Sequence, residues 1–231
     1  MKRFYESAQA VREGEGWAIK LDGRPVRTPA RAPLIVPGEA LGLEIAAEWE
    51  TQDDRIDPAT MPMTGFANAS IDRILPALDD FRAQIAAYGA SDLFCYRADE
   101  PPELVARQST AWDKLLDWAR GRYAIDFTVT AGIMPVTQPA KTLARLRDAL
   151  DALDPWLLAG AAVLTQIGGS LIGTLAHLDG MIDAPALFEA VSLDENWQAE
   201  IWGEDEEAAA RLAARRADFL GAARYCALVL A

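Results

Sequence analysis

The residues of this chain that could do chemistry are a single histidine, two cysteines and many carboxylates. Ser170, His177 and Asp179 are the residue types of a serine hydrolase triad, in which the histidine takes the proton of the serine hydroxyl. This serine, however, lacks the Gly-x-Ser-x-Gly turn that exposes such a nucleophile. We therefore interpret His177 as a histidine of the core or of a helix end, and the residues by themselves predict no catalytic site.

Metal and phosphate sites have as little support in the sequence. One histidine with two cysteines, Cys95 and Cys226, cannot supply the Cys and His sets that hold zinc. The Gly-Gly-Ser run at 168–170 lacks the lysine of a P-loop and the spacing of a dinucleotide-binding motif. We expect no cofactor, no metal and no enzyme activity. An enzyme of unknown reaction, working in a groove between two domains, is the alternative.

The composition narrows the classes of partner. The chain has 231 residues, of which 51% are hydrophobic, and a formal net charge of -13. Such a charge opposes binding to nucleic acid and to anionic membrane surfaces. Cys95 and Cys226 lie far apart and are typical of buried free thiols in a reducing compartment. The first residues, Met1-Lys2-Arg3 followed by Phe4-Tyr5-Glu6, lack the apolar stretch of a secretory signal.

The elements that would hold these residues are of two kinds. Residues 17–22 alternate between apolar and polar side chains as a half-buried strand does, and Asp22-Gly23 predicts a tight turn into a return strand. With residues 3–11 and 34–36 these strands make a small antiparallel sheet. We predict an α+β fold, with a small N-terminal antiparallel β-rich domain over residues 1–37, or extending toward residue 60, followed by a larger, mainly α-helical domain over residues 38–231.

Beyond the sheet, apolar residues recur mostly at helical spacing. Thr64 is a candidate helix cap, and residues 125–130 alternate like one further strand. Residues 155–178 carry no Asp, Glu, Lys or Arg and are long enough to span a membrane, but the small residues at 168–170 favour two buried helices that meet there. The predicted helices include residues 38–52, 140–153, 156–167, 170–178, 184–202 and 204–228.

The stretch 192–207 combines acidic residues with tryptophan. Leu193, Trp197 and Ile201 recur at a four-residue step and so share one face of a helix. The acids lie off that face, and no Lys or Arg interrupts the run. An amphipathic helix with a solvated acidic face explains the pattern, and so does an acidic surface with tryptophan anchors that meets a partner protein. Trp49 and Trp202, both flanked by acids, are candidates for the rim of such a surface.

Several short motifs occur in the same order as in one protein family. In these motifs the chain resembles the assembly chaperone for the alpha subunit of the F(1)-ATPase head of ATP synthase, and the resemblance covers essentially the whole chain. The motifs are Arg-Phe-Tyr at 3–5, Leu-Asp-Gly-Arg-Pro-Val-Arg-Thr-Pro at 21–29, Glu-Trp-Glu-Thr-Gln at 48–52, Met-Pro-Met-Thr at 61–64, Asp-Leu-Phe-Cys-Tyr-Arg at 92–97, Gln108 with Trp112, Gly-Ser-Leu at 169–171, Leu-Asp-Glu-Asn-Trp-Gln at 193–198 and Trp-Gly-Glu-Asp-Glu-Glu at 202–207.

The resemblance implies a function. Such chaperones bind newly made alpha subunit, prevent its aggregation and deliver it for assembly of the F(1) head with the beta subunit; they are not enzymes. Mitochondrial members carry a targeting extension, whereas here the first motif begins at Arg3, as in a bacterial, cytoplasmic form. We expect unassembled alpha subunit as partner, no nucleic acid, no membrane insertion and a monomer when free. By motif position, the residues expected to bind the partner are Glu48, Trp49, Gln52, Asp194, Glu195, Trp202, Asp205 and Glu207.

Overall fold

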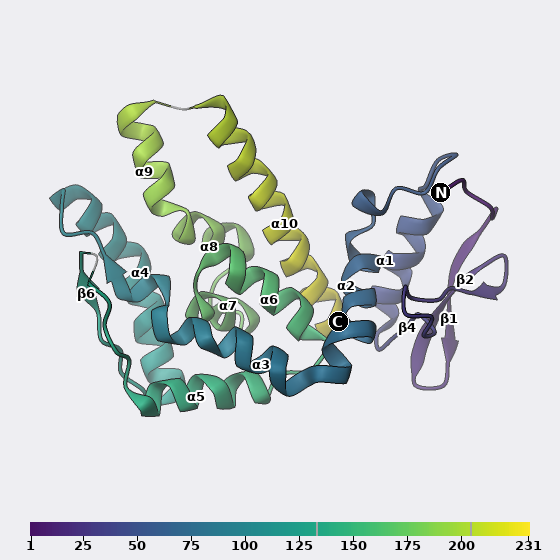
Figure 1. Cartoon of the computed structure of the whole chain (residues 1–231), viewed down its shortest axis with the longest axis horizontal. Helices are drawn as coiled ribbons and strands as arrows, with labels where there is room; N and C mark the ends of the chain where they lie inside the picture. Colours follow the sequence, from purple (N-terminus) through teal and green to yellow (C-terminus); the bar gives the residue numbers. More distant parts are fainter. Residues whose placement is uncertain (133, 204) are drawn as a thin grey trace. The chain divides into compact units, whose positions relative to one another are not determined.

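The computed structural model describes residues 1–132, 134–203 and 205–231. It has the predicted fold class, with a small N-terminal antiparallel sheet followed by a mainly helical region (Figure 1). By their contacts the residues form two compact units. The first unit comprises Met1–Leu78, Asp154–Gly160 and Gly221–Ala231, and the second comprises Asp79–Leu153 and Ala161–Leu220. Whether residues 1–37 fold as a domain of their own stays a prediction.

The sheet of the first unit is built around a central hairpin. Strand β1 (Ala8–Glu13) pairs antiparallel with β2 (Gly16–Leu21), and β2 also pairs with the short strands β3 (Arg24–Pro25) and β4 (Ile35–Val36). The turn predicted at Asp22-Gly23 is confirmed, with both residues at positive φ. The return strand is much shorter than predicted, because prolines within it cannot donate to the sheet.

Helix α1 (Glu39–Glu50) packs on the sheet, and small residues let it approach closely (Figure 1). A Cβ at Gly42 would lie only 3.0 Å from the Cβ of Trp17, so a larger residue there would push the helix away. The chain then continues into α2 (Pro62–Ala69). Beneath these elements Tyr5, Leu21, Ile56 and Met61 form a buried apolar cluster.

The second unit is almost wholly helical. Its longest complete helix, α4 (Pro102–Tyr123), packs against the short buried helix α7 (Leu171–Leu178). The other helices of this unit, some shared with the first, are α3 (Leu78–Ala86), α5 (Ala140–Asp151), α6 (Leu157–Gly168), α8 (Ala184–Val191), α9 (Leu193–Trp202) and α10 (Glu206–Leu230).

The prediction for residues 155–178 is confirmed. Helices α6 and α7 are separate and meet at Gly169, whose φ of 64° suits glycine. Ser170 caps α7, because its hydroxyl oxygen accepts from the Gly173 N–H at 2.9 Å. Among the described residues no helix is both long enough and apolar enough to cross a membrane.

Two predicted elements were wrong. Residues 184–202 form two helices, α8 and α9, since the backbone of Ser192 departs from helical geometry between them. Of the strand predicted at 125–130, only Thr130 joins a sheet, in the two-residue strand β6 (Thr130–Ala131) that pairs parallel with β5 (Tyr96–Arg97). The Gln138 side chain explains the second difference, because its amide bonds both the N–H and the carbonyl of Thr128 in place of a partner strand.

Candidate partner-binding site

The eight residues predicted to bind a partner divide between the two units. Glu48, Trp49 and Gln52 lie at the end of α1 or just after it, in the first unit. The other five lie on or between α9 and α10, in the second unit. The two groups have different surroundings: side chains of the first group bond largely within their own unit, whereas no residue of the second group is buried.

Glu48 serves as the cap of the following helix. Its side chain is 9% exposed, and its carboxylate accepts from the Met63 N–H at 2.6 Å, the Thr64 N–H at 2.8 Å and the Thr64 hydroxyl at 2.8 Å. Thr64, predicted as the cap, instead lies inside α2, which begins at Pro62. Burial raises the pKa of Glu48 above its ordinary value, although the three hydrogen bonds act in the opposite direction.

Loss of this cap should be measurable. Glu48→Ala leaves first-turn N–H groups of α2 without an acceptor, so we expect a loss of about 2 kcal/mol in the free energy of unfolding. Glu48→Gln keeps one acceptor oxygen and should lose less. Urea denaturation measures both, with the exposed turn residue Glu15→Ala as the control. A loss for Glu48→Ala no larger than that of the control would contradict the capping role.

Gln52 and Trp49 are also tied to their own unit. The Gln52 amide donates to the Glu48 carbonyl and to the Thr60 hydroxyl, both at 3.0 Å, and accepts from the Asp57 N–H at 2.7 Å. The Trp49 carbonyl accepts from the Tyr5 hydroxyl at 2.6 Å, and the two rings meet edge to face. The Trp49 indole is half-buried. That these residues contact a partner stays a prediction.

Helices α9 and α10 leave a long stretch of surface without a tertiary cover. No described residue from Leu193 to Asp218 is buried, although a surface helix normally buries one apolar stripe. The predicted stripe is only half-buried at Leu193 and Trp197, and the side chains of Ile201 and Trp202 are 57% and 77% exposed. The acidic run continues to residue 207, and Glu204 within it lies outside the described residues.

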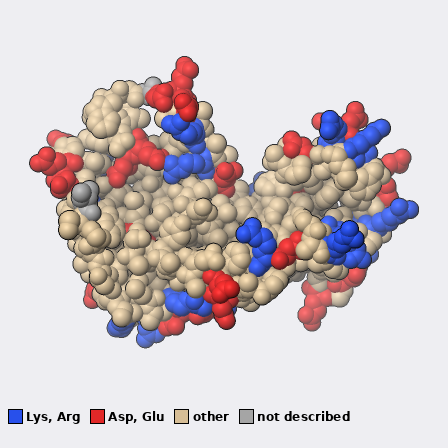
Figure 2. Space-filling model, viewed as in Figure 1, with Lys and Arg blue, Asp and Glu red and all other residues tan. Residues whose placement is uncertain are grey.

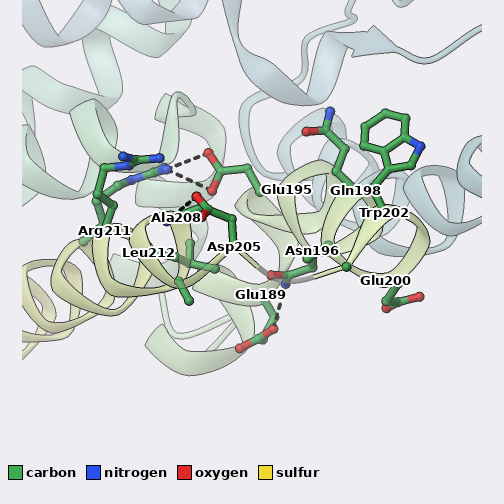
Figure 3. Close-up of a pocket in the computed structure, with 14 residues that line it drawn as sticks. Glu189, Glu195, Asn196, Gln198, Glu200, Trp202, Asp205, Ala208, Arg211 and Leu212 are labelled. Carbon is green, nitrogen blue, oxygen red and sulfur yellow. Dashed lines mark hydrogen bonds and ion pairs between the residues drawn. The ribbon is translucent and has the colours of Figure 1, made fainter.

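A cleft of about 830 Å³ lies between α9 and the first half of α10; we call it the α9–α10 cleft (Figure 3). Three predicted residues line it, namely Glu195, Trp202 and Asp205. The other two predicted residues lie beside it: the Asp194 carboxylate accepts from the Gln108 amide of α4 at 2.7 Å, and Glu207 pairs with Arg211 at 2.6 Å. The structure thus brings together one part of the predicted set.

Charge gathers around the cleft. In Figure 2 acidic and basic atoms surround a hollow over α9 and α10. Arg215 pairs with Glu195 at 2.6 Å and also donates to the Ile167 carbonyl, which holds the two helices at a set separation. Glu200, which also lines the cleft, pairs with Arg107 of α4 at 2.8 Å, and that guanidinium lies over the Trp197 ring at 4.6 Å.

Sequence reasoning missed part of the cleft wall. Glu189 of α8 and the residues Ala208, Ala209 and Leu212 of α10 also line it. Their spacing on α10 is that of one helix face, which is a signal present in the sequence. What the sequence does not carry is which other helix this face meets.

The hydrolase reading has no geometric support. The Ser170 hydroxyl donates to the buried Asp92 carboxylate at 2.8 Å, whereas a ring nitrogen of His177 lies 3.0 Å from the Ile182 carbonyl. His177 is in the last turn of α7, so its interpretation as a helix-end histidine is confirmed. Within the described ranges, no group of three or more His, Cys, Asp or Glu side chains is arranged to hold a metal ion.

Several known proteins are similar to this chain in sequence or in fold. The family model described as ATP12 chaperone protein matches residues 2–120. The mitochondrial protein atp12 of Schizosaccharomyces pombe is 24% identical over 225 residues, which are 90% of this chain and 75% of that protein. The crystal structure of Atp12 from Paracoccus denitrificans is 42% identical, with a TM-score of 0.94 and coverage of 99% of this chain and 98% of that one. A point mutant of the Paracoccus protein matches equally well, at 41% identity and a TM-score of 0.94 over 99% of this chain and 97% of that chain.

The fold, the uncovered helical surface and these relatives define the class of the protein, which is that of a chaperone. The chain belongs to the ATP12 chaperone family. The resemblance drawn from the short motifs is therefore confirmed.

Proposed function

We propose that this protein is an ATP synthase assembly chaperone that binds unassembled alpha subunit, prevents its aggregation and delivers it for assembly with the beta subunit. The observation that carries the proposal, beside family membership, is the uncovered surface of α9 and α10, where Trp202 and Ile201 are exposed beside a charged cleft. Exposed aromatic anchors within a polar rim are the usual composition of a protein-binding surface.

A transient chaperone must bind a nascent subunit and then release it. An interface of exposed helix side chains around paired charges suits that requirement, because electrostatic complementarity raises the rate of encounter more than it raises affinity. The acidic excess of the whole chain, with a net charge of -13, points in the same direction and disfavours nucleic acid as a partner. We infer that the protein acts as a binding protein rather than an enzyme and is a monomer in the cytoplasm before it meets its partner.

The test is reconstitution with purified subunits. Tagged protein is mixed with alpha subunit, with beta subunit or with both, and the complexes are separated by gel filtration while light scattering follows aggregation. We expect a complex with the alpha subunit alone, less scattering from it, and release of the chaperone when beta subunit is added. Binding to neither subunit, or only to an assembled head, would refute the proposed function.

Salt should slow association with the alpha subunit. Raising the ionic strength from about 0.05 M to about 0.5 M shortens the screening length well below the size of the charged surface, so we expect the association rate constant to fall about tenfold. Stopped-flow tryptophan fluorescence can record the association, since Trp202 is exposed in the free protein. An association rate that is unchanged by salt would rule out electrostatic steering.

A further inference from the structure

The α9–α10 cleft is large enough to admit side chains of another molecule. Its volume of about 830 Å³ is in the range of ligand pockets. Several of the residues that line it are small, namely Ala199, Gly203, Ala208 and Ala209. On α9 the cleft extends from Glu195 to Trp202, about two helical turns. Figure 3 shows Glu195, Gln198 and Trp202 in line along the same side of α9.

The charge around the cleft is unbalanced. Four carboxylates line it, from Glu189, Glu195, Glu200 and Asp205, against two guanidinium groups, from Arg211 and Arg215. Both arginines are already paired, with Glu207 and Glu195, and Glu200 is paired with Arg107. Glu189 and Asp205 have no cationic partner within the described part of the chain. A cation brought by another molecule would find two carboxylates free to pair with it.

The protein itself shows how such side chains hold a cation. Arg107 lies over the Trp197 ring and pairs with Glu200, and Arg97 lies over the Trp112 ring and pairs with Asp113 at 2.7 Å. In both cases a tryptophan face and a carboxylate together hold an arginine within the second unit. No arginine of the described residues lies over the Trp202 ring, which is 77% exposed and can pack an apolar side chain at the rim of the cleft.

The walls of the cleft select the secondary structure of its occupant. An extended segment needs backbone groups to pair with, as at a sheet edge, but here both walls are helices whose backbone bonds are internal. A helix satisfies its own backbone and needs only side-chain contacts at every third or fourth residue. A helix is therefore the occupant that leaves no backbone group unpaired.

We propose that the α9–α10 cleft receives a helix of the alpha subunit that carries Lys or Arg along one edge and an apolar side chain packed on Trp202. The cationic edge pairs with Glu189 and Asp205, while the small residues of α10 admit close approach of the helices. This inference rests on the proposed function, because the partner is the alpha subunit.

Two variants separate the apolar from the charged contribution. Trp202→Ala should weaken binding of purified alpha subunit about 30-fold, as loss of a hot-spot anchor does. The double variant Glu189→Gln with Asp205→Asn should weaken it about tenfold at low salt and flatten its salt dependence. Asparagine retains the cap that Asp205 provides to the Ala208 N–H, so the change removes charge alone. Met181→Ala and Asp148→Asn, on exposed residues of the same unit away from the cleft, should change affinity less than twofold.

Cross-linking identifies the occupant. A photoreactive amino acid at Ala209 should capture one segment of the alpha subunit that is helical and carries Lys or Arg at a three- or four-residue step, whereas the same group at the exposed Lys141 should capture none. If wild-type protein fails to bind the alpha subunit, the proposed function and this inference fall together. If it binds but both cleft variants bind normally, or if Ala209 captures an extended or acidic segment, the function stands and the helix-in-cleft inference is overturned.

Discussion

Asp92→Ala is expected to lower the free energy of unfolding by about 4 kcal/mol, because it removes one acceptor group from three donors at once. The Asp92 side chain is fully buried, and its carboxylate accepts from the Phe94 N–H at 3.1 Å, the Ser170 hydroxyl at 2.8 Å and the Ile172 N–H at 2.9 Å. These bonds join the loop before β5 to the start of α7, so their loss leaves buried donors without water or protein partners.

Thermal and urea unfolding measure the effect, and a loss of about 4 kcal/mol corresponds to a fall of roughly 10 °C in the melting temperature of a chain this long. Asp92→Asn keeps one acceptor oxygen and should lose about half as much, since its amide nitrogen then faces a donor. Asp80→Ala, on an exposed residue of the same unit, serves as the control and should stay within about 0.5 kcal/mol. A loss below 1 kcal/mol for Asp92→Ala would show that the three bonds are dispensable.

The difference in stability between the wild type and Asp92→Asn should depend on pH. Burial raises the pKa of Asp92 to about 6, and the hydrogen bonds from Ile172, Ser170 and Phe94 offset only part of that rise. The folded state therefore takes up this proton at a higher pH than the unfolded state, whose aspartate titrates near pH 4. Between pH 7 and pH 5 the wild type should gain about 1 kcal/mol relative to Asp92→Asn. A gap that stays constant between pH 7 and pH 5 would mean that the carboxylate remains ionised in the folded state.

Trp112→Ala should cost a similar amount, about 4 kcal/mol, through a cavity rather than through unpaired donors. Trp112 of α4 is fully buried, its ring lies 5.6 Å from that of Phe94, and its indole N–H donates to the Ala190 carbonyl at 2.7 Å. That carbonyl lies in the last turn of α8, where no further helical N–H can reach it. The variant therefore loses packing and also leaves the end of α8 without its partner.

A second substitution separates the two contributions. Trp112→Phe keeps most of the apolar volume but loses the bond to Ala190, so we expect a loss of about 1.5 kcal/mol. Trp118→Ala is the matched control on the same helix, because that ring is only half-buried and should cost less. Urea denaturation of the three variants ranks their losses in the free energy of unfolding. Equal losses for Trp112→Phe and Trp112→Ala would assign the whole effect to the hydrogen bond.

Several motifs that mark the family contain side chains that hydrogen-bond to other parts of the chain and so stabilise the fold. The Arg3 guanidinium donates to the carbonyls of Tyr5 and Glu50, both at 3.1 Å, and so ties the first motif to the Glu-Trp-Glu-Thr-Gln motif. Asp92 ties a third motif to Ser170, and Gln108 bonds both the Ala98 N–H and Asp194. Such residues bond to one another within the chain, and whether the predicted residues among them also contact a partner stays a prediction.

The sequence by itself determined the fold class, the glycine-marked ends of the helices and the family. Local signals carry these features: alternation in β2, the Asp22-Gly23 turn, and the break between α6 and α7 at Gly169. Each of these structural features depends on residues that are close together in the sequence, so the sequence alone can predict it.

Only the tertiary structure decided how distant side chains are used. The carboxylate of Glu48 caps a helix that begins at Pro62, and the amide of Gln138 completes the backbone of Thr128 in place of the predicted strand. The α9–α10 cleft likewise depends on the separation of two helices, which Arg215 helps to set through Glu195 and Ile167. Periodicity shows which face of a helix is apolar, but what that face meets depends on contacts between residues far apart in the chain.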